Sequence, residues 1–414
     1  MTRSITRCAI KLFFLFDLVA ISAYGMLAGG RPNAISGGQN AFAGIVNPAN
    51  AVWIEDRFDV GCFLVHQGAS IDNRDNNPFF PPGKINQTYK AGFLSTADVA
   101  IHKRVQIKKH DCSFSLAGYT TPGYFKVRTK EPISIAGTTP ILVENKTQVI
   151  SSVFSLKLND SHSIGFSLDY FYLSYRRDGF QRSDNPLRSV SPGHVTNKGM
   201  DHSNGLGLSL GWRWNMSKSL TFGFAFVKKS YVGQYRKYRG YEPHHAKNYI
   251  PETIGAGFTY LFTEKIAGRL EVLWTDFGNL PNSNNTILPN GKLNVNKRGS
   301  DKSPGTGLQD ATFINMGMGY KWNPQLSFGA GFSHRIKLRK KSPYFISRSY
   351  THQIIYNILS FGVNFNYHPH DFFLTFSHGF ENRESGYMPI ELGGGKFIGK
   401  KGNDSLSIAW GYLY

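Results

Sequence analysis

The residue patterns that could support catalysis or metal binding are few. Gly207-Leu-Ser-Leu-Gly211 matches the Gly-x-Ser-x-Gly pattern of a serine nucleophile, but that motif needs a sharp turn from a strand into a helix. Here it lies within one continuous alternating segment, so its glycines and serine are expected to be small residues on one face of a strand. His368-Pro-His370 is expected to be a solvated turn, and the sequence has no phosphate-binding loop, metal-ligand spacing or convincing catalytic triad. We therefore expect no enzyme activity, no cofactor and no metal.

Basic residues form a second group. Lys228-Lys229 precedes Tyr235-Arg236-Lys237-Tyr238-Arg239, and a further run follows His334, in a 414-residue chain with a net charge of +20. In a soluble protein, basic residues interleaved with tyrosine would indicate nucleic-acid binding. In external loops of a membrane protein they would instead face lipopolysaccharide phosphates or an acidic ligand, or they are simply solvated. We expect no nucleic-acid partner.

The elements that carry these residues are alternating segments. In residues 252–277 one face holds Ile254, Phe258, Tyr260, Leu270 and Trp274, and a short polar turn separates its two halves. A period of two on both sides of a turn predicts a β-hairpin, and strands of about 9–11 residues can cross a bilayer when tilted. Fourteen such strands are expected, at 57–66, 91–103, 112–128, 148–158, 163–175, 205–215, 219–231, 252–262, 266–277, 311–322, 326–337, 352–367, 371–380 and 404–414.

The connections between these strands alternate between short turns and long polar loops. This alternation and the even strand number are typical of an outer-membrane barrel, whereas a soluble sandwich gives no reason for them. Leu406, Ile408, Trp410, Tyr412 and Tyr414 share one face of the last strand, which resembles the C-terminal signal read by the outer-membrane insertion machinery. The predicted fold is all-β: a transmembrane antiparallel β-barrel of about 14 strands in the bacterial outer membrane.

The N-terminus predicts export. Arg3, Arg7 and Lys11 precede an apolar stretch, and Ala23-Tyr24-Gly25 is a plausible cleavage site, so residues 1–25 are expected to be a cleavable signal peptide. Residues 26–56 lack alternation, and residues 57–414 are expected to form the barrel. Cys62 and Cys112 remain after cleavage and are either a disulfide or ordinary wall residues.

Three stretches make the chain resemble the FadL/TodX family of outer-membrane transporters for long-chain fatty acids and hydrocarbons. They are Asn47-Pro48-Ala49 with the residues just before it, the hairpin at 251–277, and residues 310–332 with Asn323-Pro324-Gln325 at their turn. The resemblance implies a short N-terminal plug in the lumen of the barrel, formed by residues 26–56. It also implies that Asn47, Pro48 and Ala49 of this plug lie against an inward kink in the third strand. Pro122 and Gly123 are the candidate kink, because proline cannot join a ladder; an ordinary bulge is the alternative.

The family resemblance also implies a passive path for hydrophobic molecules, with capture at the external mouth and lateral exit through the wall. Candidate carboxylate partners are the inward Arg213, Arg269 and Lys321, which could equally form a structural network with Glu271 and Asp169. Inward Phe171, Leu273 and Phe373 could line an apolar path. Two other functions stay open from the residues: a general porin for small polar solutes, and a surface adhesin or structural protein that uses its basic loops. The expected partners are a hydrophobic ligand, the lipid bilayer and lipopolysaccharide.

Overall fold

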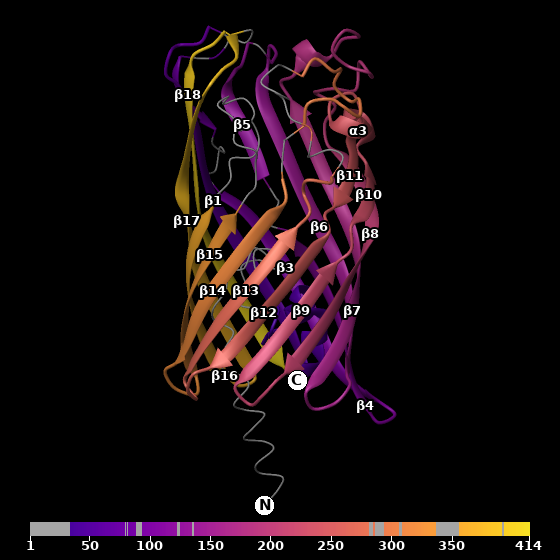
Figure 1. Ribbon diagram of the computed structural model, residues 1–414, viewed down its shortest axis with the longest axis vertical. Helices are drawn as coiled ribbons and strands as arrows, with labels where there is room; N and C mark the ends of the chain where they lie inside the picture. Colours follow the sequence, from indigo (N-terminus) through magenta and orange to yellow (C-terminus); the bar gives the residue numbers. More distant parts are fainter. Residues whose placement is uncertain are drawn as a thin grey trace, which may run out of the picture.

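The protein is a closed antiparallel barrel (Figure 1). The computed structural model describes residues 34–414 except 79, 81, 88–92, 122–124, 135, 281–284, 286–293, 306–308, 337–355 and 391–392. The last strand pairs with the first from Arg57↔Leu413 to Asn73↔Phe397, and this pairing closes the cylinder. The predicted barrel fold is therefore confirmed.

The wall consists of fourteen strands, and each overlaps one of the predicted segments. In chain order they are β1 (Arg57–Asn73), β3 (Phe93–Ile107), β4 (His110–Thr120), β6 (Pro140–Lys157), β7 (His162–Asp178), β8 (Asp201–Asn215), β9 (Leu220–Val227), β12 (Thr253–Leu261), β13 (Ile266–Thr275), β14 (Ala311–Lys321), β15 (Leu326–Ile336), β16 (Asn357–Tyr367), β17 (His370–Tyr387) and β18 (Lys396–Leu413).

Shorter elements complete the fold. β2 (Gly83–Gln87) pairs with β1, β5 (Phe125–Pro132) pairs with β6, and β10 (Ser230–Gln234) pairs with β11 (Lys247–Ile250). The helices are α2 (Ala43–Val46), η2 (Pro48–Trp53), η3 (Gln181–Ser183), η4 (Arg236–Tyr238) and α3 (Pro243–Ala246). None of the helices in the described ranges is long and apolar enough to cross a membrane.

An apolar belt surrounds the lower part of the barrel. On β7 the outward side chains Ile164, Phe166, Leu168 and Tyr170 are exposed, whereas the alternate residues face the lumen and are small or polar. An apolar outer face is stable where it meets lipid rather than water. Aromatic rings gather at the lower edge of this belt, where Trp212 stacks on His162 and Trp410 stacks on His370, as expected for an interfacial girdle.

The upper rim of the barrel has two heights. We call β17, β18, β1 and β6–β8 the tall wall, and β9 and β12–β16 the low wall (Figure 1). β8 continues for eight residues beyond its last pair with β9, Ser209↔Val227. At about 3.3 Å per residue, this extension adds roughly 26 Å of strand. The sequence prediction missed much of this height on β1, β6, β17 and β18. It placed the corresponding segments at 57–66, 148–158, 371–380 and 404–414, so their upper parts were left out.

Cys62 and Cys112 are free thiols, so the disulfide alternative is wrong. Cys62 lies on β1 and Cys112 on β4, and these strands are separated by β3. Cys62 is exposed on the outer face and Cys112 is buried, so the two side chains belong to non-adjacent strands.

Candidate functional site: an apolar mouth above a segment in the lumen

The face that carries apolar residues changes along β7. Below Tyr170 the apolar side chains point outward, but above it the inward Phe171, Leu173 and Tyr175 are buried, and the outward residues include Ser174 and Arg176. The strand keeps its alternation through this point without a register shift. The outer face of a strand carries apolar residues where it meets lipid and polar residues where it meets water. The change at Tyr170 therefore marks the outer edge of the belt.

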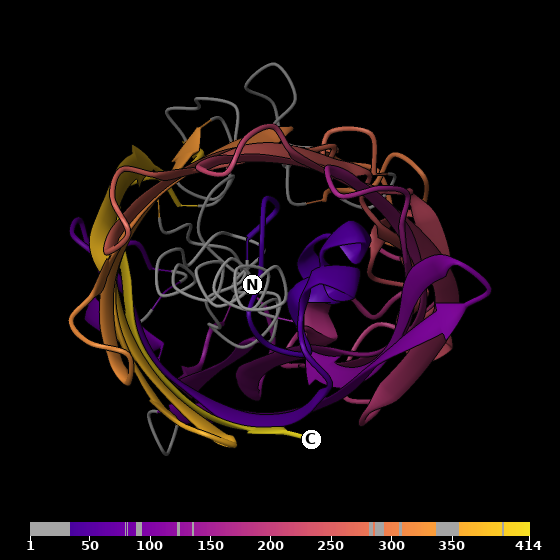
Figure 2. The same cartoon turned by 90° about the horizontal axis from the view of Figure 1, so that it is seen from below.

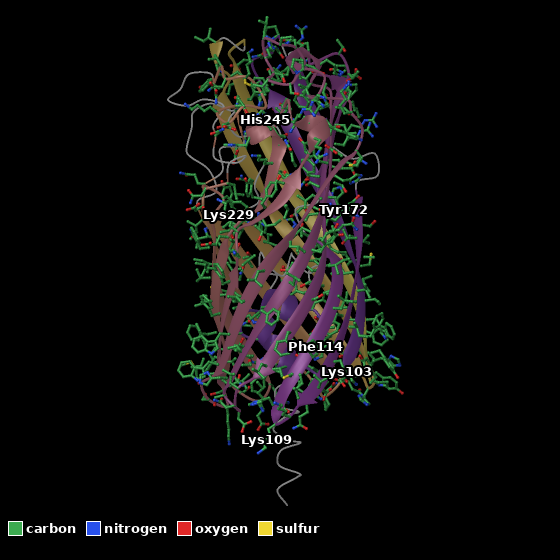
Figure 3. All side chains as sticks on the ribbon, turned by 90° about the vertical axis from the view of Figure 1, so that its right-hand side faces the viewer. Lys103, Lys109, Phe114, Tyr172, Lys229 and His245 are labelled. Carbon is green, nitrogen blue, oxygen red and sulfur yellow. The ribbon has the colours of Figure 1, made fainter. Side chains whose placement is uncertain are left out.

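The neighbouring tall-wall strands show the same change. On β6 the inward Ile141, Val143 and Val149 are buried, and the outward Glu144 forms an ion pair with Lys126 of β5 (3.1 Å). On β18 the inward Phe397 is fully buried. In Figure 3, Tyr172 and Lys229 lie at about the same height, well above the belt residue Phe114. Above this height the tall wall is polar outside and apolar inside.

These inward side chains form a single apolar cluster, which we call the mouth cluster. It consists of Ile71, Phe80, Ile133, Ile141, Val143, Val149, Phe171, Leu173, Tyr175, Phe180, Val195, Val232, Tyr235, Tyr238, Tyr241, Ala246, Met388 and Phe397. Several of its members come from the segment 230–250, which follows the low-wall strand β9. A Cβ on Gly205 of β8 would lie 2.5 Å from Val232 Cα, so only glycine lets β10 pack directly on the inner face of β8. The expectation that the Tyr235–Arg239 cluster is a solvated loop is therefore wrong for its tyrosines.

A buried ion pair ties this segment to the tall wall. The Arg177 guanidinium donates to Glu242 Oε1 (2.7 Å) and to the Tyr175 hydroxyl (2.6 Å), and it stacks 4.1 Å from the centroid of Tyr241. The charge of Arg177 is thus paired and surrounded by aromatic rings. Burial raises the pKa of the Tyr235 and Tyr238 hydroxyls, so both stay neutral in the cluster.

Residues 34–56, which we call the inner segment, lie inside the ring. Figure 2 shows α2 and η2 against the inner surface of the barrel. Ile35 N–H donates to Glu271 Oε1 of β13 (2.7 Å), and Trp53 Nε1–H donates to Ser163 Oγ of β7 (2.7 Å). Contacts with two separate strands of the wall, β13 and β7, hold the segment inside the lumen.

Asn47, Pro48 and Ala49 form a close contact between the inner segment and the wall. The Asn47 side-chain amide donates to the carbonyls of Ile35 (2.6 Å) and Trp212 (3.1 Å), and its Oδ1 accepts from Ala49 N–H (3.1 Å). Asparagine before proline is a favourable start for the short helix η2. A Cβ on Gly165 would lie 2.5 Å from Pro48 C, and one on Gly211 would lie 2.0 Å from Asn47 Oδ1. The two wall glycines create the space that these three residues fill.

A second anchor holds the start of the segment at the lower end of the barrel. Arg57 is 2% exposed, binds Asp59 (2.8 Å) and Asp371 (3.0 Å), and donates to the Gln39 carbonyl (2.5 Å). Asp59 also accepts from Ala41 N–H (2.7 Å). Each charge is therefore paired and hydrogen-bonded, which burial demands.

The wall is interrupted beside the inner segment. The β3–β4 ladder ends at Val99↔Gly118, and β4 stops at Thr120, whereas its continuation β5 pairs with β6 alone among the described strands. The predicted kink residues Pro122 and Gly123 lie outside the described residues, between β4 and β5. Phe42 packs behind this site with Ala41, Ala100 and Ala117, and Tyr119 packs against both this group and the mouth cluster.

The six predicted path residues all have inward positions, but the structure does not bring them together. Phe171 belongs to the mouth cluster, and Leu273 packs with Ile35 and Val46 of the inner segment. Arg213 stacks on Trp53 at 5.0 Å. The remaining three lie elsewhere on the inner face: Arg269 two residues from Glu271 on β13, Lys321 at the lower end of β14 and Phe373 on β17.

Sequence reasoning missed most of the mouth cluster. The signal that could have revealed it is the change of apolar face between Tyr170 and Phe171, and again between Val149 and Ile150. Of the predicted network partners, Asp169 accepts hydrogen bonds from Ser151, Ser167 and Ser209. The Gly-x-Ser-x-Gly serine, Ser209, is thus a hydrogen-bond donor within β8, as its place inside a strand predicts.

The fold and the inner segment define a class: a closed fourteen-stranded barrel with a lipid-facing belt, an apolar mouth and a folded segment in its lumen. No protein-family model and no curated protein sequence matches the chain. Among solved structures, it is similar to a deletion mutant of the TodX monoaromatic hydrocarbon channel (TM-score 0.64, 15% identity, 96% of this chain and 100% of that chain).

Two further solved structures are similar to this chain over nearly its whole length. They are the toluene transporter TbuX of Ralstonia pickettii (TM-score 0.64, 11% identity, 96% and 99% covered) and a FadL homologue of Pseudomonas aeruginosa (TM-score 0.63, 14% identity, 96% and 99% covered). The fold of this chain is that of the FadL/TodX-type barrels.

Proposed function

We propose that this protein is an outer-membrane channel through which hydrophobic molecules pass without energy input. The observation that carries the proposal is the apolar mouth cluster, enclosed by the tall wall above the lipid belt. A hydrocarbon chain gains about 0.8 kcal/mol per buried methylene on leaving water. An apolar interior held above the membrane would therefore capture such molecules where a water-filled pore would not. The names of the similar solved structures support the same class of substrate.

The proposed route leads from the mouth cluster to the wall interruption. Tyr119 packs against both the mouth cluster and the group around Phe42, so it links the two regions. A molecule that follows Phe171, Val149 and Tyr119 would reach the end of the β3–β4 ladder and leave sideways into the bilayer there, with Pro122 and Gly123 as the kink. The inner segment, held by Asn47, Pro48 and Ala49, is proposed to be the plug that closes the straight path through the lumen.

Arg176 of β7 and Lys400 of β18 are exposed on the outer face of the tall wall. They support a location in the outer membrane, facing lipopolysaccharide. The predicted signal peptide, residues 1–25, lies outside the described residues and stays part of this proposal. So does recognition of β18 by the insertion machinery. Arg213, Arg269 and Lys321 are proposed to brace the lumen together with Glu271, because Arg213 and Glu271 both contact the inner segment.

Uptake of labelled toluene and oleate by cells with and without the protein tests this proposal. Uptake of at least one compound should require the protein and should fall when Gly118 beside the gap, or Gly123, is replaced by tryptophan. Gly394, a positive-φ residue with open space around it, provides a control as Gly394→Asn. Equal uptake with and without the protein would refute the channel.

Conductance separates the proposed channel from the two rival functions. In a planar bilayer, the intact protein should conduct little until residues 34–56 are deleted, whereas a general porin would conduct steadily from the start. An adhesin would lose host-ligand binding on deletion of its basic loops and would show no uptake defect.

A further inference from the structure

The outer face of the tall wall changes in ordered rows above the belt. The top row of the belt, in register across β6, β7 and β8, consists of the exposed residues Ile150, Tyr170 and Leu206. The outward row above it consists of Gln148, Tyr172 and Asn204. The next consists of Lys146, Ser174 and His202. The outer face therefore passes from apolar groups to amides and a phenol, and then to basic and hydroxyl groups.

His202 is held in place by the neighbouring strand. Its ring stacks on Tyr172 with 5.1 Å between the centroids, and its Nδ1 lies 2.9 Å from the Tyr172 hydroxyl and 3.2 Å from the Ser174 hydroxyl. His202 is nevertheless exposed. With Nδ1 accepting from these hydroxyls, Nε2 carries a proton that can be donated to a phosphate or sugar oxygen outside the barrel.

The rows higher on the wall add positive charge. Lys126, Glu144 and Arg176 are in register across β5, β6 and β7, and the row above them consists of Arg128, Leu142 and Asp178. Glu144 pairs with Lys126 (3.1 Å), and Asp178 pairs with Arg176 (2.7 Å). With Lys146, four basic side chains face two carboxylates, an excess of two positive charges. This face is therefore suited to an anionic partner.

The order of the rows matches one kind of lipid. At about 3.4 Å per residue, successive outward rows lie about 7 Å apart along the strands. A phosphorylated glycolipid has acyl chains, then amides and sugar hydroxyls, then phosphates, in the same order outward from the bilayer. Figure 3 places Tyr172 level with Lys229, which follows β9 of the low wall, so the tall wall continues upward where the low wall ends.

We infer that the outer face of β5–β8 is a binding site for the lipid A part of lipopolysaccharide. The acyl chains would lie on the belt below Tyr170, and a phosphate would lie against Lys146 and His202. The inference rests on the proposed location in the outer membrane, but it concerns the outer face of the wall and not the route for hydrophobic molecules. Continuity with the lipid-facing belt and the excess of positive charge support it.

Lipid binding by the purified protein tests the inference. Detergent-solubilised protein is titrated with bisphosphorylated lipid A, with its dephosphorylated form and with phosphatidylglycerol. Bisphosphorylated lipid A should bind about tenfold more tightly than either other lipid, because charge-assisted hydrogen bonds to phosphate are strong. Lys146→Gln and His202→Gln together should weaken its binding about tenfold.

Lys109→Gln is the matched control, because Lys109 is exposed and lies at the opposite, lower end of the barrel (Figure 3). Folding of each variant is checked by its heat-dependent shift in gel mobility. Equal affinity for the three lipids, or unchanged lipid A binding in the double variant, would overturn the inference and leave the channel intact. Self-association that the double variant abolishes would assign this face to a second copy of the chain and also overturn the inference. Absence of the protein from outer-membrane fractions would instead refute the proposed location.

Discussion

The tall wall and the low wall use the same alternating strands in different surroundings. Low-wall strands such as β13 keep one arrangement throughout, with Leu270 and Val272 outward in lipid and Glu271 and Leu273 inward. Tall-wall strands such as β7 exchange their faces at Tyr170. The comparison shows that the sequence of a barrel strand encodes where the membrane ends. Apolar residues point outward to lipid within the membrane and inward to the lumen above it.

A one-residue insertion between Tyr170 and Phe171 should break this arrangement most severely. It would turn Phe171, Leu173 and Tyr175 outward, and at about 2 kcal/mol for each large side chain the loss is about 6 kcal/mol. Uptake and protease resistance of the outer loops should both be lost. A two-residue insertion restores the faces and is the control; equal damage from both insertions would show that the exchange of faces is irrelevant.

Removal of the Glu242 charge should release the segment 230–250 from the tall wall. Glu242→Gln leaves Arg177 buried without its charged partner, which costs about 4 kcal/mol. Limited proteolysis should then cut within residues 228–250. Asp178→Asn, which removes the partner of Arg176 on the outer face, should cost about 0.5 kcal/mol. If Glu242→Gln resists proteolysis as well as Asp178→Asn does, the ion pair between Arg177 and Glu242 does not hold the segment in place.

The inner and outer faces of the low wall can be compared on a single strand. Leu273→Ala opens a cavity beside Ile35 and should lower the free energy of unfolding by about 3 kcal/mol. Leu270→Ala, three residues away and 48% exposed to lipid, should cost about 1 kcal/mol, because acyl chains fill the vacated space. Denaturant titration in detergent micelles measures both, and equal losses would mean that the inner segment does not support this wall.

The smallest effect is expected at the lower end of the barrel. Burial raises the pKa of Asp56, but hydrogen bonds from the Lys103 ammonium and from Arg104 N–H outweigh it and hold that pKa below 3.8. Because the folded-state pKa is depressed, this stabilisation is present above pH 3.8 and is lost as the pH falls through the lower value. Asp56→Asn should reduce the thermal midpoint by about 1 °C at neutral pH, and the difference from wild type should shrink near pH 3. A difference that is the same at both pH values would contradict this role.

The sequence was sufficient to predict the barrel because lipid imposes a simple local rule on every strand. Ile254, Phe258 and Leu270 alternate with small or polar neighbours, so each strand could be recognised without knowledge of the others. The mouth could not be recognised in this way. Val232 is buried because glycine at position 205 of β8 lets it approach that strand. Tyr238 is buried against the ring of Tyr175, which lies on β7. Such contacts link distant parts of the chain, and no local pattern encodes them.

The Arg57 anchor also has a consequence for the order of biogenesis. Arg57 and Asp59 belong to the first strand and Asp371 to the penultimate one, and the same side chains hold Gln39 and Ala41. These partners are brought together only when the two ends of the sheet meet. Sealing of the seam therefore completes the charged cluster that holds the inner segment, and a barrel that seals without that segment would leave the bonds from Ala41 to Asp59 and from Arg57 to Gln39 unmade.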